Sequence, residues 1–428
     1  MTEVNETVNT VEIKTGPIRP QTVVVPGSKS FSHRMLIAAS LADGCSIIDN
    51  CLESDDTTYT VRALKQLGVA IRGGFERLSI EGKGGRFDAS EEPIFVGNSG
   101  TSMRLLTALV ALGRGTYVLT GTDRMQERPL DDLLDGLVQI EVPARALKNN
   151  GCPPVEVRGG EGAGGPLRLR CGKSSQYLSA MLLIAPYLEK GVEIEVIEGP
   201  VSKPYIDMTI HVMEQFGVHV ERSGHRYFKV TGRQSYRSGC YAVEPDGSQA
   251  GYFWAAAAVT GSAATVRGTR TDSLQGDIRL VRLLEAMGCR CTEERDGIRL
   301  QGGRLEAIDA DMADMPDMVP TLAIVSAFAR GTTRIRNVAH LRVKESDRLA
   351  AVADGLTRMG ISAVCTADGL VVEGGNPHGA EIDTFDDHRI AMSFAVAGLA
   401  VPGVVIRDAH CVEKSFPNFW EVFSGLYV

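Results

Sequence analysis

Apolar runs that each open with a small polar cluster recur along the chain at nearly constant spacing. They begin near Gly27, Gly97, Gly172, Asp246, Asp317 and Asp386. Successive starts lie 70, 75, 74, 71 and 69 residues apart. Each run is apolar nearly all round, which predicts a helix buried in a core. Six units at this period account for nearly the whole chain, and a fixed period of this kind indicates a repeat architecture.

A second, amphipathic helix is expected in each unit, followed by a hairpin. The clearest examples are 55–66, 203–215, 277–286 and 346–358, which end before Gly68, Gly217, Gly288 and Gly360. A glycine just past the last periodic residue is the usual helix C-cap. The alternating segments that follow, with a central Gly or Asp-Gly, predict two-stranded hairpins. In the second unit, 138–159 keeps the spacing, but its prolines weaken the pattern.

Each unit therefore reads as strand, helix, strand, helix and two-stranded hairpin, a mixed α/β fold. A chain of 428 residues exceeds one ordinary core, so we expect two similar domains of three βαβαββ units with buried inner helices. Facing domains would bring the N-termini of these helices around one interdomain cleft. Helix N-termini attract anions, so such a cleft would hold a small anion without the protein being basic overall.

Composition narrows the function classes. Hydrophobic residues make up 43% and charged residues 23%, as in soluble globular proteins. The net charge of -8 argues against nucleic acid or an anionic membrane as the main partner. The first ten residues lack the basic and apolar parts of a secretory signal, so we expect a cytoplasmic protein. The most apolar stretch, 390–406, is interrupted by Ser, Gly and Pro and reads as core.

Nine cysteines are scattered along the chain, an odd number that suits reduced thiols in a cytoplasm. Cys289 and Cys291 have no second pair or histidine to complete a zinc site, so no metal is expected. The triplet 172–174 resembles the end of a P-loop, but Leu167 stands where that motif requires its first glycine.

Basic residues stand at the starts of the predicted elements. They are Lys29, Arg34, Arg104, Arg128, Lys344, Arg348, Arg389 and Lys414. The simplest interpretation of each is a solvated surface charge. Recurrence at matching places favours a shared role. Converging cations repel by about 1 to 4 kcal/mol per pair unless a ligand offsets the repulsion. A ligand with phosphate and carboxylate groups would do so.

Carboxylates and neutral polar groups accompany these cations. Asp317 opens an inner helix and Glu345 lies between Lys344 and Arg348, which makes both candidates for acid/base chemistry. The simpler interpretations are a helix cap for Asp317 and a first-turn charge for Glu345. The segment 386–389 has a similar alternative of cap plus surface charge. Residues 174–176 could supply hydroxyls and an amide to a ligand, or only cap a helix.

Nine motifs, in this order and spacing, carry a specific resemblance over the full chain. They are PGSKSFSHR, NSGTSMR, RMQERP, SSQY, SKPYID, MPD, RVKESDR, DDHRIAM and EKSFPNF. The chain resembles the 5-enolpyruvylshikimate-3-phosphate synthase family of enolpyruvyl transferases. That family has two domains of three βαβαββ units, in agreement with the repeat. The resemblance implies one domain at 24–242 and a second, discontinuous domain built from 1–23 and 243–428.

The implied reaction belongs to the shikimate pathway of aromatic amino acid biosynthesis, which leads to chorismate. The enolpyruvyl group of phosphoenolpyruvate passes to the 5-hydroxyl of shikimate 3-phosphate, and phosphate leaves after addition and elimination. The family uses no metal and no organic cofactor. The expected partners are these two small molecules, with no nucleic acid and no membrane, and we expect a monomer.

The resemblance also implies roles for individual residues. Lys29 would contact both substrates and transfer protons, Asp317 would take the 5-hydroxyl proton, and Glu345 would act at the methylene carbon. Phosphoenolpyruvate would be bound by Lys29, Gly100, Arg128, Gln176, Arg348, Arg389 and Lys414. Shikimate 3-phosphate would be bound by Lys29, Ser30, Arg34, Ser174, Ser175, Gln176, Ser202, Tyr205, Asp317 and Lys344.

The chain departs from the family's pattern in places. His340 stands where some members have an Asn that contacts shikimate 3-phosphate, Leu105 stands where many have Pro, and 138–159 is unlike most relatives. Gly100 leaves room at the phosphoenolpyruvate site, so we expect inhibition by glyphosate, a mimic in that site.

Two alternatives remain open at this point. One is the sister transferase that acts on UDP-N-acetylglucosamine, although 120–127 lacks that enzyme's reactive cysteine. The other is a non-catalytic anion-binding repeat protein, for which the carboxylates Asp317 and Glu345 would serve no purpose.

Overall fold

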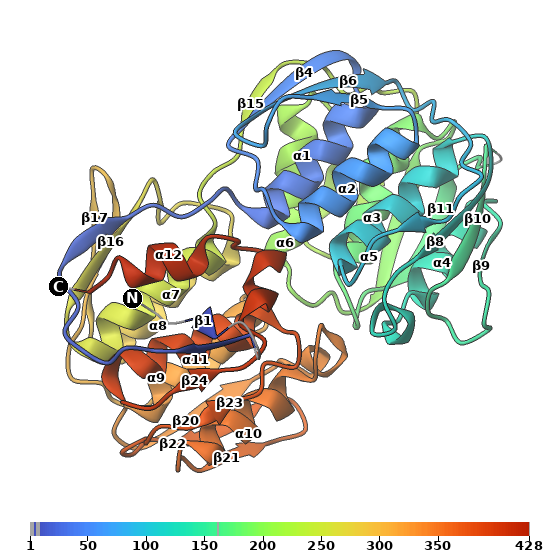
Figure 1. The fold of residues 1–428 in the computed structure, drawn as a ribbon. Coiled ribbons are helices and arrows are strands. Elements are labelled where there is room, and N and C mark those ends of the chain that lie inside the picture. The colour runs from blue at the N-terminus through green and yellow to red at the C-terminus, as the bar shows by residue number, and fades with distance from the viewer. Residues whose placement is uncertain (1–3, 6–8, 161, 428) are drawn as a thin grey trace. The chain divides into compact units, whose positions relative to one another are not determined.

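The computed structural model describes residues 4–5, 9–160 and 162–427. The chain divides into two compact units, a central unit of residues 27–244 and a split unit of residues 1–26 and 245–428 (Figure 1). The family resemblance implies the corresponding boundaries at residues 24 and 242. In the part of the chain that the structure describes, no helix is both long and apolar enough to cross a membrane.

The central unit contains alternating helices and strands. Its helices are α1 (Lys29–Leu41), α2 (Asp55–Gln66), α3 (Gly100–Leu109), α4 (Asp131–Gln139), α5 (Gln176–Ile184) and α6 (Pro204–Gln215). Its strands are β4 (Asp43–Asp49), β5 (Ala70–Arg72), β6 (Arg77–Lys83), β7 (Ile94–Phe95), β8 (Gly115–Thr120), β9 (Ala144–Ala146), β10 (Val155–Gly159), β11 (Gly165–Arg170), β12 (Val192–Glu198), β13 (Glu221–Ser223), β14 (Tyr227–Val230) and β15 (Cys240–Ala242). The hairpin of the second repeat, expected to be irregular, forms as β9 and β10.

The split unit repeats the plan. Its helices are α7 (Gly247–Thr260), α8 (Leu280–Ala286), α9 (Val319–Ala327), α10 (Arg348–Arg358), α11 (His388–Ala400) and α12 (Phe419–Ser424). Its strands are β1 (Val4–Asn5), β2 (Thr10–Glu12), β3 (Gln21–Val23), β16 (Ala263–Arg267), β17 (Arg290–Glu294), β18 (Gly297–Gln301), β19 (Asp309–Asp311), β20 (Thr332–Arg336), β21 (Ala363–Cys365), β22 (Leu370–Glu373), β23 (Glu381–Ile382) and β24 (Val405–Ile406). Two short 3₁₀ turns matter for the site, η4 (Gly276–Arg279) and η5 (Pro316–Met318).

All six described sheets have four strands and the same pairing. In the sheet β7-β8-β10-β9, the first two strands are parallel and the other two pairs are antiparallel. The same pattern holds in β11-β12-β14-β13 and in β19-β20-β22-β21. The parallel pair spans a buried helix, and the antiparallel strands form the hairpin. The predicted βαβαββ repeat and the mixed α/β class are therefore confirmed.

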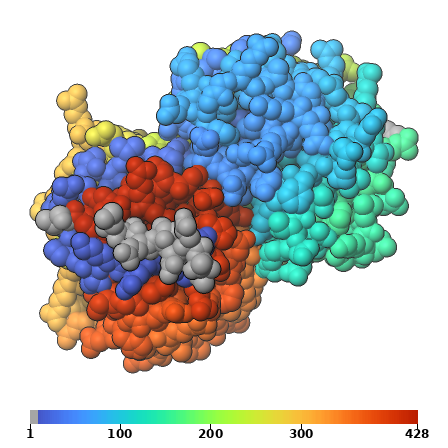
Figure 2. Space-filling view, viewed as in Figure 1, coloured from blue at the N-terminus to red at the C-terminus, as the bar shows by residue number. Residues whose placement is uncertain are grey.

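Three sheets are completed by strands from distant parts of the chain. The first repeat takes its parallel strand from β15, which pairs with β4. The fourth repeat takes β3, which pairs with β16. The last repeat takes its hairpin from β1 and β2, because β2 pairs with β24. Figure 2 shows the N-terminal and C-terminal segments side by side on the split unit.

The two helix types differ in burial as the sequence predicts. The inner helices α3, α5 and α9 are buried along almost their entire length, whereas α2 and α10 bury one face. Each unit has its own hydrophobic core built around three inner helices. The expected C-cap glycines all have positive φ, from 78° at Gly360 to 110° at Gly288, a conformation that glycine adopts without strain.

The chain passes between the units at two adjacent segments. The Ser28 amide donates to the Glu244 carbonyl at 2.8 Å, and the Asp246 amide donates to the Pro26 carbonyl at 2.9 Å. A Cβ on Gly27 would lie 2.0 Å from the Asn50 carbonyl oxygen, so only glycine fits there. This close approach places Ser28 directly before α1, where its hydroxyl accepts from the Phe31 amide.

Candidate active site

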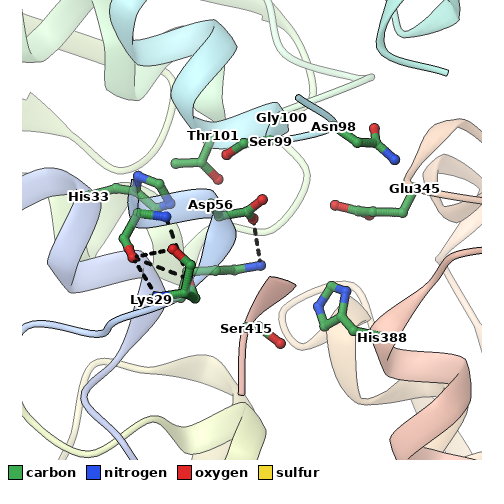
Figure 3. A network of polar contacts seen from close by, with 12 residues as sticks. Lys29, His33, Asp56, Asn98, Ser99, Gly100, Thr101, Glu345, His388 and Ser415 are labelled. Atoms are coloured by element: carbon green, nitrogen blue, oxygen red, sulfur yellow. Dashed lines mark hydrogen bonds and ion pairs between the residues drawn. The ribbon is translucent and has the colours of Figure 1, made fainter. Parts of the chain in front are cut away.

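The first turn of α1 carries a buried ion pair. Lys29 Nζ lies 3.1 Å from Asp56 Oδ2, and the two side chains are 12% and 4% exposed (Figure 3). Asp56 stands in the first turn of α2, where the helix dipole favours a negative charge. A buried lysine keeps its charge best beside a carboxylate. The sequence-predicted catalytic lysine is thus held at the point where α1 and α2 begin.

A buried chain of hydroxyls and one imidazole lies behind this pair. His33 Nδ1 is 2.8 Å from Thr60 Oγ1, and Thr60 Oγ1 is 2.8 Å from Ser102 Oγ. Ser102 donates to the Asp56 carbonyl at 3.1 Å. Burial, with the nearby Lys29 cation, lowers the pKa of His33 to about 3, so the ring is neutral. These hydrogen bonds join the N-terminal halves of α1, α2 and α3.

Arg34 joins α1 to α6. Its Nε donates to Thr209 Oγ1 at 2.7 Å, and its Nη atoms donate to the carbonyls of Ser30 and Tyr205 at 2.8 and 3.0 Å. The side chain is almost fully buried, and burial lowers the pKa of the guanidinium to about 10. Arg34 remains charged at neutral pH, and its buried position excludes the interpretation as a solvated surface charge.

The start of α3 brings two arginines together around Gly100. Arg104 Nη1 donates to the Gly100 carbonyl at 3.0 Å and to Gln176 Oε1 at 3.2 Å. Arg128 Nη1 donates to the backbone and side-chain oxygens of Asn98 at 2.9 and 3.1 Å. A Cβ on Gly100 would lie 2.5 Å from a guanidinium nitrogen of each arginine. The absence of a side chain at Gly100 is therefore what lets both guanidinium groups approach.

Gln176 connects this group to α5. Its Nε2 donates to Thr101 Oγ1 at 2.9 Å while its Oε1 accepts from Arg104. Ser174 and Ser175 precede Gln176 and are both buried. Ser175 makes no capping bond through its side chain, and Ser174 accepts from the Gln176 amide at 3.2 Å. Within the central unit, hydrogen bonds thus link the N-termini of all three inner helices.

In the split unit, Arg348 lies at the centre of a buried carboxylate cluster. Its guanidinium donates to Asp317 Oδ1, Glu345 Oε2 and Asp387 Oδ2, each at 2.8 Å. The side chain is 2% exposed. Asp387 is fully buried, and its Oδ2 also accepts from Ser346 at 3.0 Å. Burial would lower the pKa of Arg348, but the three carboxylates outweigh burial and raise it.

Arg389 shares Asp317 with Arg348. Arg389 Nη2 donates to Asp317 Oδ2 at 2.8 Å and to Ser248 Oγ at 3.4 Å. Its backbone amide donates to Asp387 Oδ1 at 3.0 Å, which caps α11. Residues at the starts of α7, α9 and α11 are thereby joined in one cluster.

Asp317 has a clear electrostatic character. Burial would raise its pKa, but Arg389, Arg348 and Lys344 outweigh burial and hold the pKa well below its usual range. The carboxylate is therefore ionised and can accept a proton only transiently. Burial, together with Lys344 and Arg348, lowers the pKa of His340 to about 3, so this neighbouring ring is neutral.

The structure corrects the simpler interpretations of three acids. Asp317 makes no capping bond, because it lies in η5 before α9 and binds two arginines instead. Glu345 precedes α10 and bonds Arg348, and Asp347 is the residue that caps this helix. Asp387 does cap α11, but it is buried and holds Arg348, so it is not a surface charge.

The remaining predicted residues lie near helix starts or, for Lys414, at the end of a 3₁₀ turn over residues Ala409–Lys414. Lys414 and Ser202 are nearly buried, and Ser202 has a positive φ of 54° just before α6. Ser30, Tyr205 and Lys344 are partly exposed. Sequence reasoning did not assign Asp56, Asn98, Asp277 or Ser248 to the site. Each stands beside an assigned segment at a helix start, where the sequence alone suggests only capping.

Comparison with known proteins gives one consistent family. The family model described as EPSP synthase (3-phosphoshikimate 1-carboxyvinyltransferase) matches residues 16–423. The 3-phosphoshikimate 1-carboxyvinyltransferase of Syntrophobacter fumaroxidans is 45% identical over 94% of this chain and 96% of its own. That of Methanospirillum hungatei is 45% identical over 94% and 95%.

A solved structure supports the same assignment. EPSP synthase from Acinetobacter baumannii superposes with a TM-score of 0.81 at 31% identity and covers 98% of each chain. These matches extend along essentially the whole sequence. The chain belongs to the EPSP synthase (3-phosphoshikimate 1-carboxyvinyltransferase) family.

Proposed function

We propose that the buried cations at the helix starts of both units bind the substrates of this family's reaction. The chain is a 3-phosphoshikimate 1-carboxyvinyltransferase, which moves the enolpyruvyl group of phosphoenolpyruvate to the 5-hydroxyl of shikimate 3-phosphate and releases phosphate. Both substrates carry phosphate and carboxylate groups, for which guanidinium groups supply paired donors. The observation that carries the proposal is Asp317 held between Arg348 and Arg389.

In this proposal, phosphoenolpyruvate is bound by Arg128, Arg348, Arg389 and Lys414, with Lys29, the Gly100 backbone and Gln176 beside it. Arg128 and Gln176 belong to the group at the start of α3, and Arg348 and Arg389 share Asp317. The arginines are oriented by neighbouring acceptors, so little side-chain freedom is lost when a ligand binds.

Shikimate 3-phosphate is assigned to Ser30, Arg34, Ser174, Ser175, Ser202, Tyr205 and Lys344, together with Lys29, Gln176 and Asp317. Hydroxyls and cations near the starts of α1, α5 and α6 suit a phosphorylated sugar-like ring. Arg34 is fixed by Thr209 and by backbone carbonyls, so it contributes a rigid positive charge.

Proton transfer is assigned to three residues. Asp317, kept ionised by its arginines, accepts the proton of the attacking 5-hydroxyl. Glu345 serves the methylene carbon during addition and elimination, and Lys29 assists at the site of both substrates. General acid/base steps contribute about 10² to 10⁴-fold each. Asp317→Asn and Glu345→Gln should therefore lower kcat by factors in this range.

A coupled assay of phosphate release tests the proposal. The protein should release phosphate from phosphoenolpyruvate with shikimate 3-phosphate and not with UDP-N-acetylglucosamine. Asp354→Asn, a change of the same kind at an acid 45% exposed on α10, should leave kcat unchanged. A kcat of Asp317→Asn equal to that of Asp354→Asn would remove Asp317 from the mechanism.

The remaining assignments concern an inhibitor, the oligomeric state, the partners and the compartment. We propose that glyphosate competes with phosphoenolpyruvate, and that the enzyme works as a cytoplasmic monomer without nucleic acid or membrane partners. Competitive inhibition kinetics against phosphoenolpyruvate and sedimentation equilibrium of the purified chain test the inhibitor and the monomer. Fractionation of cells that express the chain tests the compartment.

A further inference from the structure

A buried carboxylate lies behind the arginine–aspartate cluster of the split unit. Asp277 belongs to the turn η4 and is 4% exposed. The turn is fixed to the start of α7 by Gln275, whose Oε1 accepts from the Gly247 amide at 2.9 Å and whose Nε2 donates to the Pro245 carbonyl at 2.7 Å. These two hydrogen bonds hold the turn against the start of α7, and so they fix the position of the Asp277 backbone.

Asp277 reaches Arg389 through one hydroxyl. Ser248, in the first turn of α7, donates its hydroxyl hydrogen to Asp277 Oδ2. A serine hydroxyl has a single hydrogen and two lone pairs. With its hydrogen committed to Asp277, Ser248 Oγ can only accept from Arg389 Nη2, which lies 3.4 Å away. Asp277 therefore determines that Ser248 Oγ acts as a hydrogen-bond acceptor toward Arg389.

We propose that Asp277 and Ser248 form a positioning pair that fixes the Arg389 guanidinium for phosphoenolpyruvate. The inference rests on the proposed role of Arg389 in binding that substrate. Arg389 Nη2 is held on one side by Asp317 Oδ2 at 2.8 Å and on another by Ser248. Asp317 also serves Arg348 and is assigned a proton-transfer role, so it cannot by itself keep Arg389 in one orientation during turnover.

The charge at Asp277 is unfavourable without these partners. Burial, with Asp317 and Asp246 adding to it, raises the pKa of Asp277 to about 7, although Arg389 and the Ser248 hydroxyl act in the opposite direction. A buried polar group needs hydrogen bonds to offset its loss of water. The Ser248 hydrogen bond and the Arg389 charge both act in this direction, which ties the three side chains into one unit.

Steady-state kinetics of the full-length enzyme test the pair. Ser248→Ala and Asp277→Ala should each raise the KM for phosphoenolpyruvate roughly fivefold to tenfold, the effect of one ordinary hydrogen bond. The KM for shikimate 3-phosphate should stay within twofold. Asp277→Asn keeps an acceptor for Ser248 and should raise the KM for phosphoenolpyruvate less than Asp277→Ala does. If Asp277 only stabilised the fold, its variants would change both KM values, and Asp277→Asn would be no milder than Asp277→Ala.

The double variant separates a chain of contacts from two independent contacts. If Asp277 acts through Ser248, the KM of Ser248→Ala/Asp277→Ala should equal that of Ser248→Ala alone. If the double variant instead showed the product of the two single effects on KM, the inference would be overturned. Asp272→Ala, at an acid 82% exposed five residues before Asp277, is the matched control and should change neither KM.

Arg389→Lys distinguishes failure of this inference from failure of the assigned binding role. If Arg389→Lys leaves the KM for phosphoenolpyruvate unchanged, the role of Arg389 itself is wrong. If Arg389→Lys raises that KM while Ser248→Ala and Asp277→Ala do not, only the positioning pair is wrong. Ser248→Ala removes a single oxygen, so it keeps the test decisive if Asp277→Ala fails to fold.

Discussion

Replacing Gly100 by Ala tests how closely the arginines of the central unit approach the backbone. The added Cβ would lie 2.5 Å from Arg104 Nη1 and Arg128 Nη2, and 2.8 Å from Arg128 Cζ. Ordinary contacts at a Cβ begin at 3.4 Å, so each guanidinium must retreat by about 0.9 Å. Arg128 is tied to Asn98 and Arg104 to Gln176, so the retreat also strains these hydrogen bonds.

The expected consequence is selective loss of phosphoenolpyruvate binding. Misplacing a binding group by about 1 Å costs up to roughly 100-fold, so the KM for phosphoenolpyruvate should rise about 10 to 100-fold. Glyphosate inhibition should weaken in parallel. The KM for shikimate 3-phosphate should change less than twofold. The fold should not suffer, because Gly100 is the first residue of α3 and Ala is the better helix former by up to about 1 kcal/mol.

The assay is phosphate release with each substrate varied in turn, accompanied by a thermal melt. Gly74→Ala is the matched control, because a Cβ at Gly74 meets nothing within 4 Å. A Gly100→Ala enzyme with an unchanged Tm and a KM for phosphoenolpyruvate within twofold of the parent would refute the argument. It would mean that both guanidinium groups can retreat without cost and that their close approach to Gly100 is unrelated to binding.

Three further predictions concern buried charges. Asp387→Ala removes a buried partner of Arg348 and should lower the free energy of unfolding by about 3 to 5 kcal/mol in urea titrations; a loss below 1 kcal/mol would contradict it. Burial, with Asp317 adding to it, raises the pKa of Asp277 from 3.8 to about 7, so the folded protein holds a proton that the unfolded chain has released between these values. The free energy of unfolding should therefore fall as pH rises from about 4 to about 7, and Asp277→Asn should flatten that fall; equal slopes in both proteins would count against it. Burial lowers the pKa of His33 to about 3, so its imidazole NMR signals should not titrate between pH 5 and 8, and a midpoint near 6.5 would disprove the buried neutral ring.

The repeat was predictable because local chemistry encodes it. Apolar helical runs, amphipathic second helices and glycines such as Gly217 and Gly288 mark each unit independently of tertiary structure. The pairing of β3 with β16 and of β15 with β4 was not predictable from the local pattern. Each strand is only three residues long, and its partner lies more than 190 residues away, so pairing is decided by the assembled core.

The residues of the site were likewise predictable only in part. Lys29, Arg348 and Arg389 could be singled out from their recurrence at helix starts and from the family resemblance. Their buried partners could not, because Asp56 and Asp387 look like ordinary acids of first turns until three-dimensional structure brings a lysine or an arginine to them. The same holds for Asp277, which bonds the Ser248 hydroxyl beside Arg389. A cap and an ion-pair partner have the same sequence signature, and only distance separates the two interpretations.

The pairing of strands from distant parts of the chain also sets an order of assembly during synthesis. The central unit has every strand it needs once residue 242 has left the ribosome, whereas the split unit needs β2 and β3 from the start of the chain and β24 from near its end. Strand β2 must therefore wait, with the edge that faces β24 unpaired, while more than 390 residues follow. Unpaired strands invite wrong pairing, so the central unit should fold first and the split unit should be the one vulnerable to aggregation.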